Sequence, residues 1–401
     1  MNVLFGSLSL VILAAGPVAA LTVEEAVRVA VTNNPALAAA RQQVVAAGGR
    51  ADQARLWPNP ELELAAEDVP TRGGGGLSES VNWIGVAQTV PLPGKKSLDA
   101  RIGRRAVTAA EHEYRLRERE LVRDVKAACW RALAAEKKLG VSRELLNLAE
   151  SLRTTATKRV EAGATGPQES LRAEIEAERA RVELTAEDRE RIVALQELAM
   201  LLGQPDGPLP ALQGELTDAA HPAVAPNHPS LAAARAHQAR AELEYQRAKL
   251  DPWPDVTLGV AGGRDMATKE NLLEFRVSLP LPVFDRSQGR QRETRALAAA
   301  ARHDTTATEQ RLGRELAVAN ARLRAATEQV AAYQTRILPK TEEALKLVRG
   351  GFEAGKFGFL DLVDTQRTLA EVRLVYVDKL LELNLALADL EALAGAQPAK
   401  E

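Results

Sequence analysis

An internal duplication determines the plan of this chain of 401 residues. Three short motifs occur twice in the same order: NNPALAAAR at 33–41 and NHPSLAAAR at 227–235, VPLP at 90–93 and LPLP at 279–282, and EAG at 161–163 and 353–355. Self-similarity at a nearly constant separation is the signature of a repeated structural unit. We therefore predict two copies, at 21–202 and 227–395, joined by a proline-rich linker at 203–226 and followed by a tail at 396–401.

The composition favours long helices over a large compact core. Aromatic residues make up only 3% of the chain, although rings supply much of the buried area in globular proteins. Alanine, leucine, arginine and glutamate dominate instead, as they do in coiled coils. The formal net charge of -2 argues against a nucleic-acid-binding protein. The single cysteine, Cys129, excludes an intrachain disulfide and any CxxC zinc or redox motif.

The N-terminal segment has the features of an export signal. An apolar run at 3–15 is followed by the small residues VAA at 18–20, where signal peptidase would cut. We therefore predict a cleaved signal peptide at 1–20, with a buried N-terminal helix as the alternative. No cysteine follows the predicted cleavage site, so we do not expect a lipoprotein. No later segment approaches the roughly 18 consecutive apolar residues of a transmembrane helix.

Each copy contains two segments with strand character between its proline motifs. They span about 61–68 and 81–90 in the first copy, and about 255–262 and 272–279 in the second. Apolar and polar side chains alternate most clearly in the last segment, where Phe275 and Arg276 fall on opposite faces. One apolar and one polar face are typical of a transmembrane β-barrel strand. The same alternation is equally typical of a soluble hairpin with one buried face.

Very long helical patterns follow the strands, at about 98–161 and 288–353, and each is followed by a returning helix, at 168–202 or 359–393. In the first pattern, apolar residues alternate at spacings of four and three: Leu121, Val125, Ala128, Ala132, Ala135 and Leu139. Such spacing indicates a coiled-coil seam in which alanine permits close helix approach. We predict two antiparallel helical hairpins whose tips are glycine turns at 163–166 and 355–358.

Four strands cannot span a membrane alone, because open sheet edges would leave unpaired backbone groups in hydrocarbon. Closed barrels begin at about eight strands. Two chains would supply eight strands and three would supply twelve, so the strand count alone does not select the number of chains.

Several of these segments resemble the TolC-like outer membrane efflux proteins. The tip segment FEAGKFGFLDLVD at 352–364 is similar to the family's second periplasmic tip motif, and the duplicated plan covers essentially the whole mature chain. The exit motifs PLPGKK at 91–96 and PLPVFDRSQG at 280–289 are most similar to the heavy-metal, CzcC-type branch. The resemblance implies a homotrimer with a twelve-stranded β-barrel in the outer membrane and a tunnel of twelve helices in the periplasm.

The resemblance also implies a function and partners. The trimer would be the exit duct of a tripartite pump, joined to a periplasmic adaptor and through it to an inner-membrane transporter of the resistance-nodulation-division (RND) type. Its expected substrates are divalent heavy-metal cations, with drug export or type I polypeptide secretion as alternatives. The alternative from a different class of protein is a periplasmic coiled-coil adaptor, although adaptors usually contain one hairpin and not two.

The residues do not predict an enzyme, a cofactor or a metal site. A secreted enzyme would be expected to show a phosphate-binding loop, a nucleophile elbow or a ligand cluster, and none is recognisable. The five histidines are scattered, and only His228 and His237 lie near one another. Their separation of nine residues does not match the ligand spacing of a zinc site on a helix.

Two aspartates after the second tip are candidate gate residues. Asp361 and Asp364 are three residues apart and therefore share one face of the last helix. Acids at a helix N-terminus are also explained by interaction with the helix dipole. In the family resemblance, matching aspartates surround the periplasmic aperture, so a trimer would present six carboxylates. Rings of acidic side chains select for cations.

The glycines of the two tips, Gly163, Gly166, Gly355 and Gly358, are candidate adaptor-docking positions. Glycine at the end of a helix is explained by its tolerance of positive φ. Docking is what the family resemblance adds to this structural explanation.

Cations gather just after each barrel exit, including Lys95, Lys96, Arg286 and Arg290. Positive charge opposes the dipole at a helix N-terminus, so another interaction should favour it. We hypothesise a collar at the lipid headgroups of the outer membrane, where anionic lipid would attract these side chains. Neutralisation by nearby acids such as Asp99 and Glu293 is the alternative.

Overall fold

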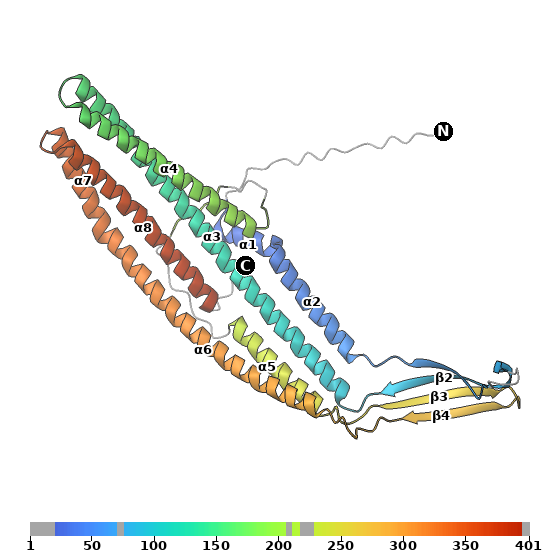
Figure 1. The fold of residues 1–401 in the computed structure, drawn as a ribbon. Coiled ribbons are helices and arrows are strands. Elements are labelled where there is room, and N and C mark those ends of the chain that lie inside the picture. Colours follow the sequence, from blue (N-terminus) through green and yellow to red (C-terminus); the bar gives the residue numbers. More distant parts are fainter. Residues whose placement is uncertain (1–20, 70–75, 206–210, 217–227, 395–401) are drawn as a thin grey trace, which may run out of the picture. The chain divides into compact units, whose positions relative to one another are not determined.

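The computed structural model describes residues 21–69, 76–205, 211–216 and 228–394 (Figure 1). The predicted signal peptide and C-terminal tail lie outside these residues, as do parts of the first glycine loop and of the linker. The described chain is mainly helical and contains one four-stranded sheet. This confirms the expected mainly α class with a small β part.

The helices and strands follow the duplicated plan. The first copy contains α1 (Val23–Asn33), α2 (Pro35–Arg55), β1 (Glu61–Glu67), the 3-10 turn η1 (Gly76–Glu79), β2 (Val81–Val90), α3 (Lys95–Glu161) and α4 (Pro167–Leu201). The second contains α5 (Pro229–Ala248), β3 (Val256–Asp265), β4 (Asn271–Ser278), α6 (Gln288–Ala332), the π-helical turn η2 (Tyr333–Ile337), α7 (Leu338–Glu353) and α8 (Phe359–Ala394). None of the described helices is long and apolar enough to cross a membrane.

Contacts divide the chain into two compact units, and each unit is built from both copies. The hairpin unit comprises 1–37, 118–225 and 315–401, and the sheet unit comprises 38–117 and 226–314. The long helices α3 and α6 contribute to both units. The compact units therefore differ from the two copies that the sequence repeat defines.

The sheet in the sheet unit has the order β1-β2-β3-β4, and every pair of neighbouring strands is antiparallel. Its register places large apolar side chains in matching positions on one face, which we call the apolar face. These side chains are all exposed: Leu62, Leu64, Ile84, Val86, Leu258, Val260, Leu273, Phe275 and Val277. So large an uncovered apolar surface marks a site of contact with a membrane or another protein.

The opposite face of the sheet, which we call the glycine face, consists mostly of small and polar side chains, and it also carries the ring of Trp83. At its centre Gly85 lies against Ala261, so close that a Cβ at Gly85 would be 2.7 Å from the Ala261 Cβ. On this face Arg276 of β4 reaches Glu63 of β1, with Nη1 and Oε2 2.8 Å apart. Edge strands separated by three strand spacings would be about 14 Å apart in a flat sheet. The ion pair therefore links the two edge strands across the glycine face.

The hairpin unit consists of long antiparallel hairpins, α3 with α4 and α7 with α8, each closed by a short turn (Figure 1). The predicted seam of α3 is buried along its whole length: Leu121, Val125, Ala128, Ala132, Ala135 and Leu139. Further out, Ala149 of α3 packs against Ala177 and Ala180 of α4. Small side chains allow these backbones to approach closely, which explains how a chain with few aromatic residues packs.

Pro339 does not end the second long helical segment. It lacks the N–H that an α-helix requires at its position. The preceding turn η2 is wider than an α-turn, and the Leu338 N–H donates to the Tyr333 carbonyl. The π-helical turn accommodates the proline, which cannot donate a hydrogen bond. As a result α6, η2 and α7 follow one another without an intervening loop.

Candidate functional site

The first hairpin tip is a glycine-dependent helix end. Gly163 has a φ of 68° and donates its N–H to the Val160 carbonyl at 2.9 Å. The Ala164 N–H reaches back to the Arg159 carbonyl at 2.8 Å. These two bonds form a Schellman motif, which requires a left-handed residue at the position of Gly163. Gly166 has a φ of -78°, a conformation open to any residue, and precedes the first residue of α4.

The second tip repeats the same geometry. Gly355 has a φ of 70° and donates to the Phe352 carbonyl at 3.0 Å, while the Lys356 N–H donates to the Gly351 carbonyl at 2.7 Å. Phe357 then folds over Gly351, where an added Cβ would be 2.1 Å from the phenylalanine Cδ2. The two tips therefore share one backbone design, and the second carries an aromatic ring that the first lacks.

The candidate gate residues lie in the first two turns of α8, and both are exposed. The Gly358 N–H donates to Asp361 Oδ2 at 2.8 Å, so Asp361 caps the start of the helix. Asp364 lies one turn further along, and its backbone carbonyl accepts a bond from Thr368. The helix-capping explanation thus applies to Asp361, whereas Asp364 lies beyond the capping position.

Near their tips the two hairpins are joined by apolar and aromatic contacts. Phe359, at the start of α8, is buried against Ala156 of α3 and Ala173 of α4. The guanidinium of Arg159 lies 5.4 Å from the centre of the Phe352 ring at the end of α7. Cation–π contacts of this kind contribute about 0.5–1 kcal/mol at exposed sites. The tips are therefore in direct contact across the two copies.

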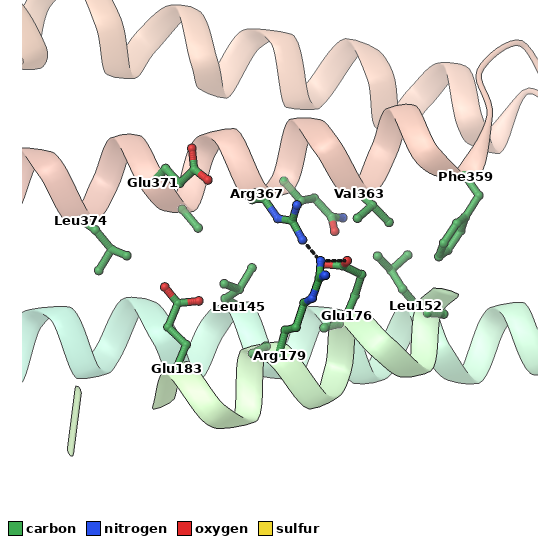
Figure 2. A pocket seen from close by; sticks show the side chains of 15 residues that line it. Leu145, Leu152, Glu176, Arg179, Glu183, Phe359, Val363, Arg367, Glu371 and Leu374 are labelled. Atoms are coloured by element: carbon green, nitrogen blue, oxygen red, sulfur yellow. Dashed lines mark hydrogen bonds and ion pairs between the residues drawn. The ribbon is translucent and has the colours of Figure 1, made fainter. Parts of the chain in front are cut away.

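Charged side chains line a small cavity beside these contacts. Arg367 of α8 forms an ion pair with Glu176 of α4, and Arg179 Nη1 lies 3.1 Å from the Glu176 Oε1 (Figure 2). The cavity has a volume of about 110 Å³, and Glu183 and Glu371 also line it. One carboxylate thus joins cations from two helices that belong to different hairpins.

More ion pairs connect α8 with the other helices. Arg373 contacts Glu144 of α3 at 3.0 Å and Glu342 of α7 at 3.3 Å. Closer to the start of α3, Lys138 pairs with Asp378 at 2.6 Å. Exposed pairs of this kind contribute little individually, but Arg373 is held from two helices at once. The last helix is therefore tied by charge to both hairpins.

The sequence did not reveal these ion pairs. Arg367 and Glu176 are 191 residues apart, and Arg373 and Glu144 are 229 residues apart. Charged residues are abundant on every helix, so their spacing does not indicate which of them meet. The repeat is the signal that could have suggested them, because it predicts that equivalent hairpins lie side by side.

In the sheet unit, Lys95 does not fit the headgroup collar. Its side chain is buried, and Nζ donates to the Trp253 carbonyl at 2.7 Å and to Asp255 Oδ1 at 2.8 Å. The Leu92 N–H donates to the same Asp255 oxygen at 2.9 Å. Burial raises the pKa of the Asp255 carboxyl, but the bonds from Lys95 and Leu92 outweigh it and hold this pKa below its ordinary value. An ammonium enclosed in this way is unavailable to lipid.

The other three collar candidates remain near solvent. Arg286 is exposed, and Arg290 is 68% exposed although its Nε lies 3.2 Å from Asp251 Oδ2. Lys96 Nζ is 3.4 Å from the Ala54 carbonyl. These three cations are therefore less enclosed than Lys95.

The described residues contain no cluster of three or more side chains that could hold a metal ion. Cys129 is buried, and burial together with the charge of Glu24 raises the pKa of its thiol to about 12. A thiol with so high a pKa is a poor metal ligand and a poor nucleophile, because both roles require the thiolate. Cys129 is therefore a small core side chain.

Comparison with known proteins finds a protein family that matches most of the chain. The model of the family "Outer membrane efflux protein" matches two stretches, residues 26–204 and 223–396. The cobalt-zinc-cadmium resistance protein CzcC of Cupriavidus metallidurans is 30% identical over 399 residues, which cover 95% of this chain and 91% of that protein. The nickel-cobalt-cadmium resistance protein NccC of Alcaligenes xylosoxydans xylosoxydans is 27% identical over 308 residues, 74% of this chain and 68% of that protein.

The fold is also known from solved structures. A crystal structure of CusC, from work on the conformational changes that accompany its folding and transmembrane channel formation, superposes on this chain with a TM-score of 0.81. The match covers 93% of this chain and 92% of that one at 19% sequence identity. At this level of identity the similarity establishes the fold alone.

Proposed function

The chain belongs to the outer membrane efflux protein family, and from this premise we propose that it is the exit duct of a tripartite efflux system for divalent heavy-metal cations. The proposal of a membrane duct is supported by the apolar face of the sheet, whose large side chains are exposed in every strand. The observation that carries the substrate is the similarity to CzcC, a cobalt-zinc-cadmium resistance protein, over 95% of the chain.

A homotrimer is the assembly that we propose. The sheet has two free edges, β1 and β4, whose backbone groups need partners in a membrane. Pairing β4 of one chain with β1 of the next closes a barrel, and three chains supply the twelve strands expected from the family resemblance. In this barrel the apolar face would meet lipid, while the glycine face with Glu63 and Arg276 would line the lumen.

The location and the partners follow from this assembly. After cleavage of the signal peptide at 1–20, the barrel would lie in the outer membrane and the hairpins would extend into the periplasm. We place the docking site for a periplasmic adaptor at the tips, around Gly163, Gly166, Gly355 and Gly358. The exposed side chains of Phe357 and Leu360 support this placement, because apolar side chains at a protruding tip favour contact with another protein. An inner-membrane RND transporter would act through that adaptor.

The gate is proposed at the second tip. Three chains would bring together six carboxylates from Asp361 and Asp364, and such a ring favours the passage of cations. The ion pairs of Arg367 and Arg373 would hold the ring narrow, because they tie α8 to both hairpins. The duct itself would pass the metal without binding it tightly.

The headgroup collar is proposed in a reduced form, with Lys96, Arg286 and Arg290 as its members. Their support is their position immediately after the strands, together with the exposure of the two arginines. Anionic headgroups would attract each cation by about 1 kcal/mol.

The experiment that tests the proposal uses a strain from which the gene has been deleted. Returning the wild-type chain should restore tolerance to cobalt, zinc or cadmium salts, and the protein should fractionate with outer membranes as an oligomer that dissociates on heating. If tolerance were restored only to dyes or detergents, the substrate would be a drug and not a metal. A protein found entirely in the soluble periplasmic fraction would overturn the duct.

A further inference from the structure

Four short segments connect the strands of the sheet unit to its helices. The first lead-in (56–61) and the second lead-in (250–255) carry the chain into β1 and β3. The first exit (90–95) and the second exit (279–287) carry it from β2 and β4 into α3 and α6. All four therefore lie at the same end of the sheet, because neighbouring strands are antiparallel.

The first exit is firmly bonded to the second lead-in. Asp255 accepts bonds from the Leu92 N–H and from Lys95, and Lys95 also donates to the Trp253 carbonyl. A Cβ at Gly94 would be 3.5 Å from Leu250 Cδ1, so the turn packs against this lead-in as well. This junction lies between β2 and β3, and it joins the two copies.

The second exit and the first lead-in lie at the two outer edges of the sheet, beyond β4 and β1. Both carry large apolar side chains that remain exposed. Phe284 of the second exit is 93% exposed, and Trp57 of the first lead-in is 59% exposed. Leu56, Leu281 and Val283 are exposed beside them. The second exit and the first lead-in therefore look like the two halves of a second junction, separated at opposite edges of the sheet.

Phe284 is presented on a turn that its own hydrogen bonds hold in shape. Asp285 Oδ1 accepts a bond from the Ser287 N–H at 2.8 Å, and Gln288 Oε1 accepts one from the Arg286 N–H at 2.9 Å. Ser287 has a φ of 54°, which is uncommon for a residue other than glycine. These two bonds define the local conformation of the turn that presents the ring.

We propose that Phe284 packs on Trp57 of a neighbouring copy of this chain and so joins adjacent chains just below the barrel. The duplication supplies the template, because the second exit should meet a lead-in on its free side as the first exit does. The carboxylate of Glu61 in the neighbouring copy would then accept the Leu281 N–H, as Asp255 accepts that of Leu92. An aromatic pair replaces the buried ammonium of the first junction.

This inference rests on the proposed closure of the barrel by further copies of the chain. Closure brings β4 beside β1 of the next chain, and it therefore brings the second exit beside the first lead-in. A lipid partner for Phe284 would not explain why the complementary apolar residues, Leu56 and Trp57, occur at the opposite edge. A second copy explains both halves.

The test is chemical cross-linking in outer membranes, in a background in which Cys129 is replaced by alanine. Phe284→Cys and Trp57→Cys are combined in one chain and treated with a short bis-maleimide, because the Cα atoms of stacked rings lie further apart than a disulfide spans. We expect covalent dimers and trimers. The matched control pairs Phe284→Cys with Leu64→Cys, which is exposed on β1, several residues beyond Trp57 along the chain.

The outcomes separate this inference from the proposed function. Efficient linking of the 57/284 pair with little linking of the 64/284 pair supports the junction. An intact trimer that the reagent does not link, or links equally through both pairs, overturns the junction and leaves the duct standing. Monomers in the soluble fraction would overturn the proposed duct itself.

A second measurement does not depend on cysteine chemistry. Phe284→Ala should lower the temperature at which the trimer dissociates in detergent, while Phe284→Tyr should restore it. The control Leu347→Ala removes another exposed apolar side chain, on α7 of the hairpin unit, and should leave dissociation unchanged. Equal behaviour of Phe284→Ala and Leu347→Ala would contradict the junction.

Discussion

Lys95 and Asp255 form an ion pair of 2.8 Å that joins the first residue of α3 to the residue preceding β3. The Lys95 side chain is only 6% exposed, and the Trp253 carbonyl accepts a second bond from it. The two copies of the repeat are thus linked at the end of the sheet by one enclosed ammonium. Its position explains why a lysine can begin a long helix against the helix dipole.

Replacement of Lys95 by methionine should destabilise the sheet unit. The change keeps the apolar stem but leaves Asp255 with a single hydrogen-bond donor, and hydrogen bonds to charged groups contribute about 1.5–3 kcal/mol. We expect a loss of this order in the free energy of unfolding, measured by urea denaturation of the purified protein in detergent. Lys96→Met is the matched control and should change stability by less than about 0.5 kcal/mol. Equal losses in the two variants would contradict the role of Lys95.

The same ion pair predicts a pH dependence. The pKa of Asp255 is lowered in the folded chain, so its ionised form stabilises the fold. This contribution is complete above the ordinary aspartate pKa of about 3.9, and it is lost as the pH falls through the lower folded value. The difference in stability between wild type and Asp255→Asn should therefore shrink on acidification below about pH 4. A difference that stays constant from pH 7 to pH 3 would contradict the assignment.

The tip glycines should differ in their tolerance of alanine. Gly163 has a φ of 68°, where a side chain costs about 1–2 kcal/mol, whereas Gly166 at -78° has open space around it. Gly163→Ala should speed amide hydrogen exchange in the last turns of α3, and Gly166→Ala should not. Because the strain is local, hydrogen exchange is the appropriate measurement. Equal exchange rates in the two variants would contradict the Schellman geometry.

The acidic pair is tested by single-channel recording. Asp361→Asn with Asp364→Asn removes both charges, while asparagine at 361 keeps an oxygen that can accept the Gly358 N–H. We expect reduced cation selectivity and weaker block by trivalent cations. Glu169→Gln is the control, because Glu169 occupies the equivalent position of the first copy and is paired with Arg159 at 3.3 Å. Unchanged selectivity in the double variant would remove the gate hypothesis.

The ion pairs of α8 should restrain the tip. Arg367→Met with Arg373→Met breaks the contacts to Glu176, Glu144 and Glu342, so α8 should separate more easily from the other helices. We expect a higher single-channel conductance. Arg172→Met, which changes an exposed arginine near the first tip, is the control. If conductance did not rise, or if it rose equally in the control, the ion pairs would not restrain the gate.

Much of the architecture could be predicted from local patterns. The seam from Leu121 to Leu139 is buried as its spacing predicted, because helix periodicity determines which side chains share a face. Strands were expected at about 255–262 and 272–279 and lie at Val256–Asp265 and Asn271–Ser278. These features depend on residues that are close together in the sequence.

The partners of Lys95 could not be predicted, for the opposite reason. Its charge and its place after a proline motif suggested a headgroup ligand, but its partners Trp253 and Asp255 are about 160 residues away. A pattern of charge along the chain does not reveal which carboxylate will come within hydrogen-bonding distance. The same limit concealed the contacts of Arg367 and Arg373.

The sequence alone determined that the chain is a duplicated, mainly helical protein with alternating strands and glycine tips, since periodicity and turn chemistry act over a few residues. Only the tertiary structure decided how the two copies combine. It placed strands from both copies in one sheet, enclosed Lys95, and left Phe284 and Trp57 exposed at opposite edges. The physical reason is that burial and ion pairing depend on distances in space between segments far apart in the chain, which the duplication implies but does not specify.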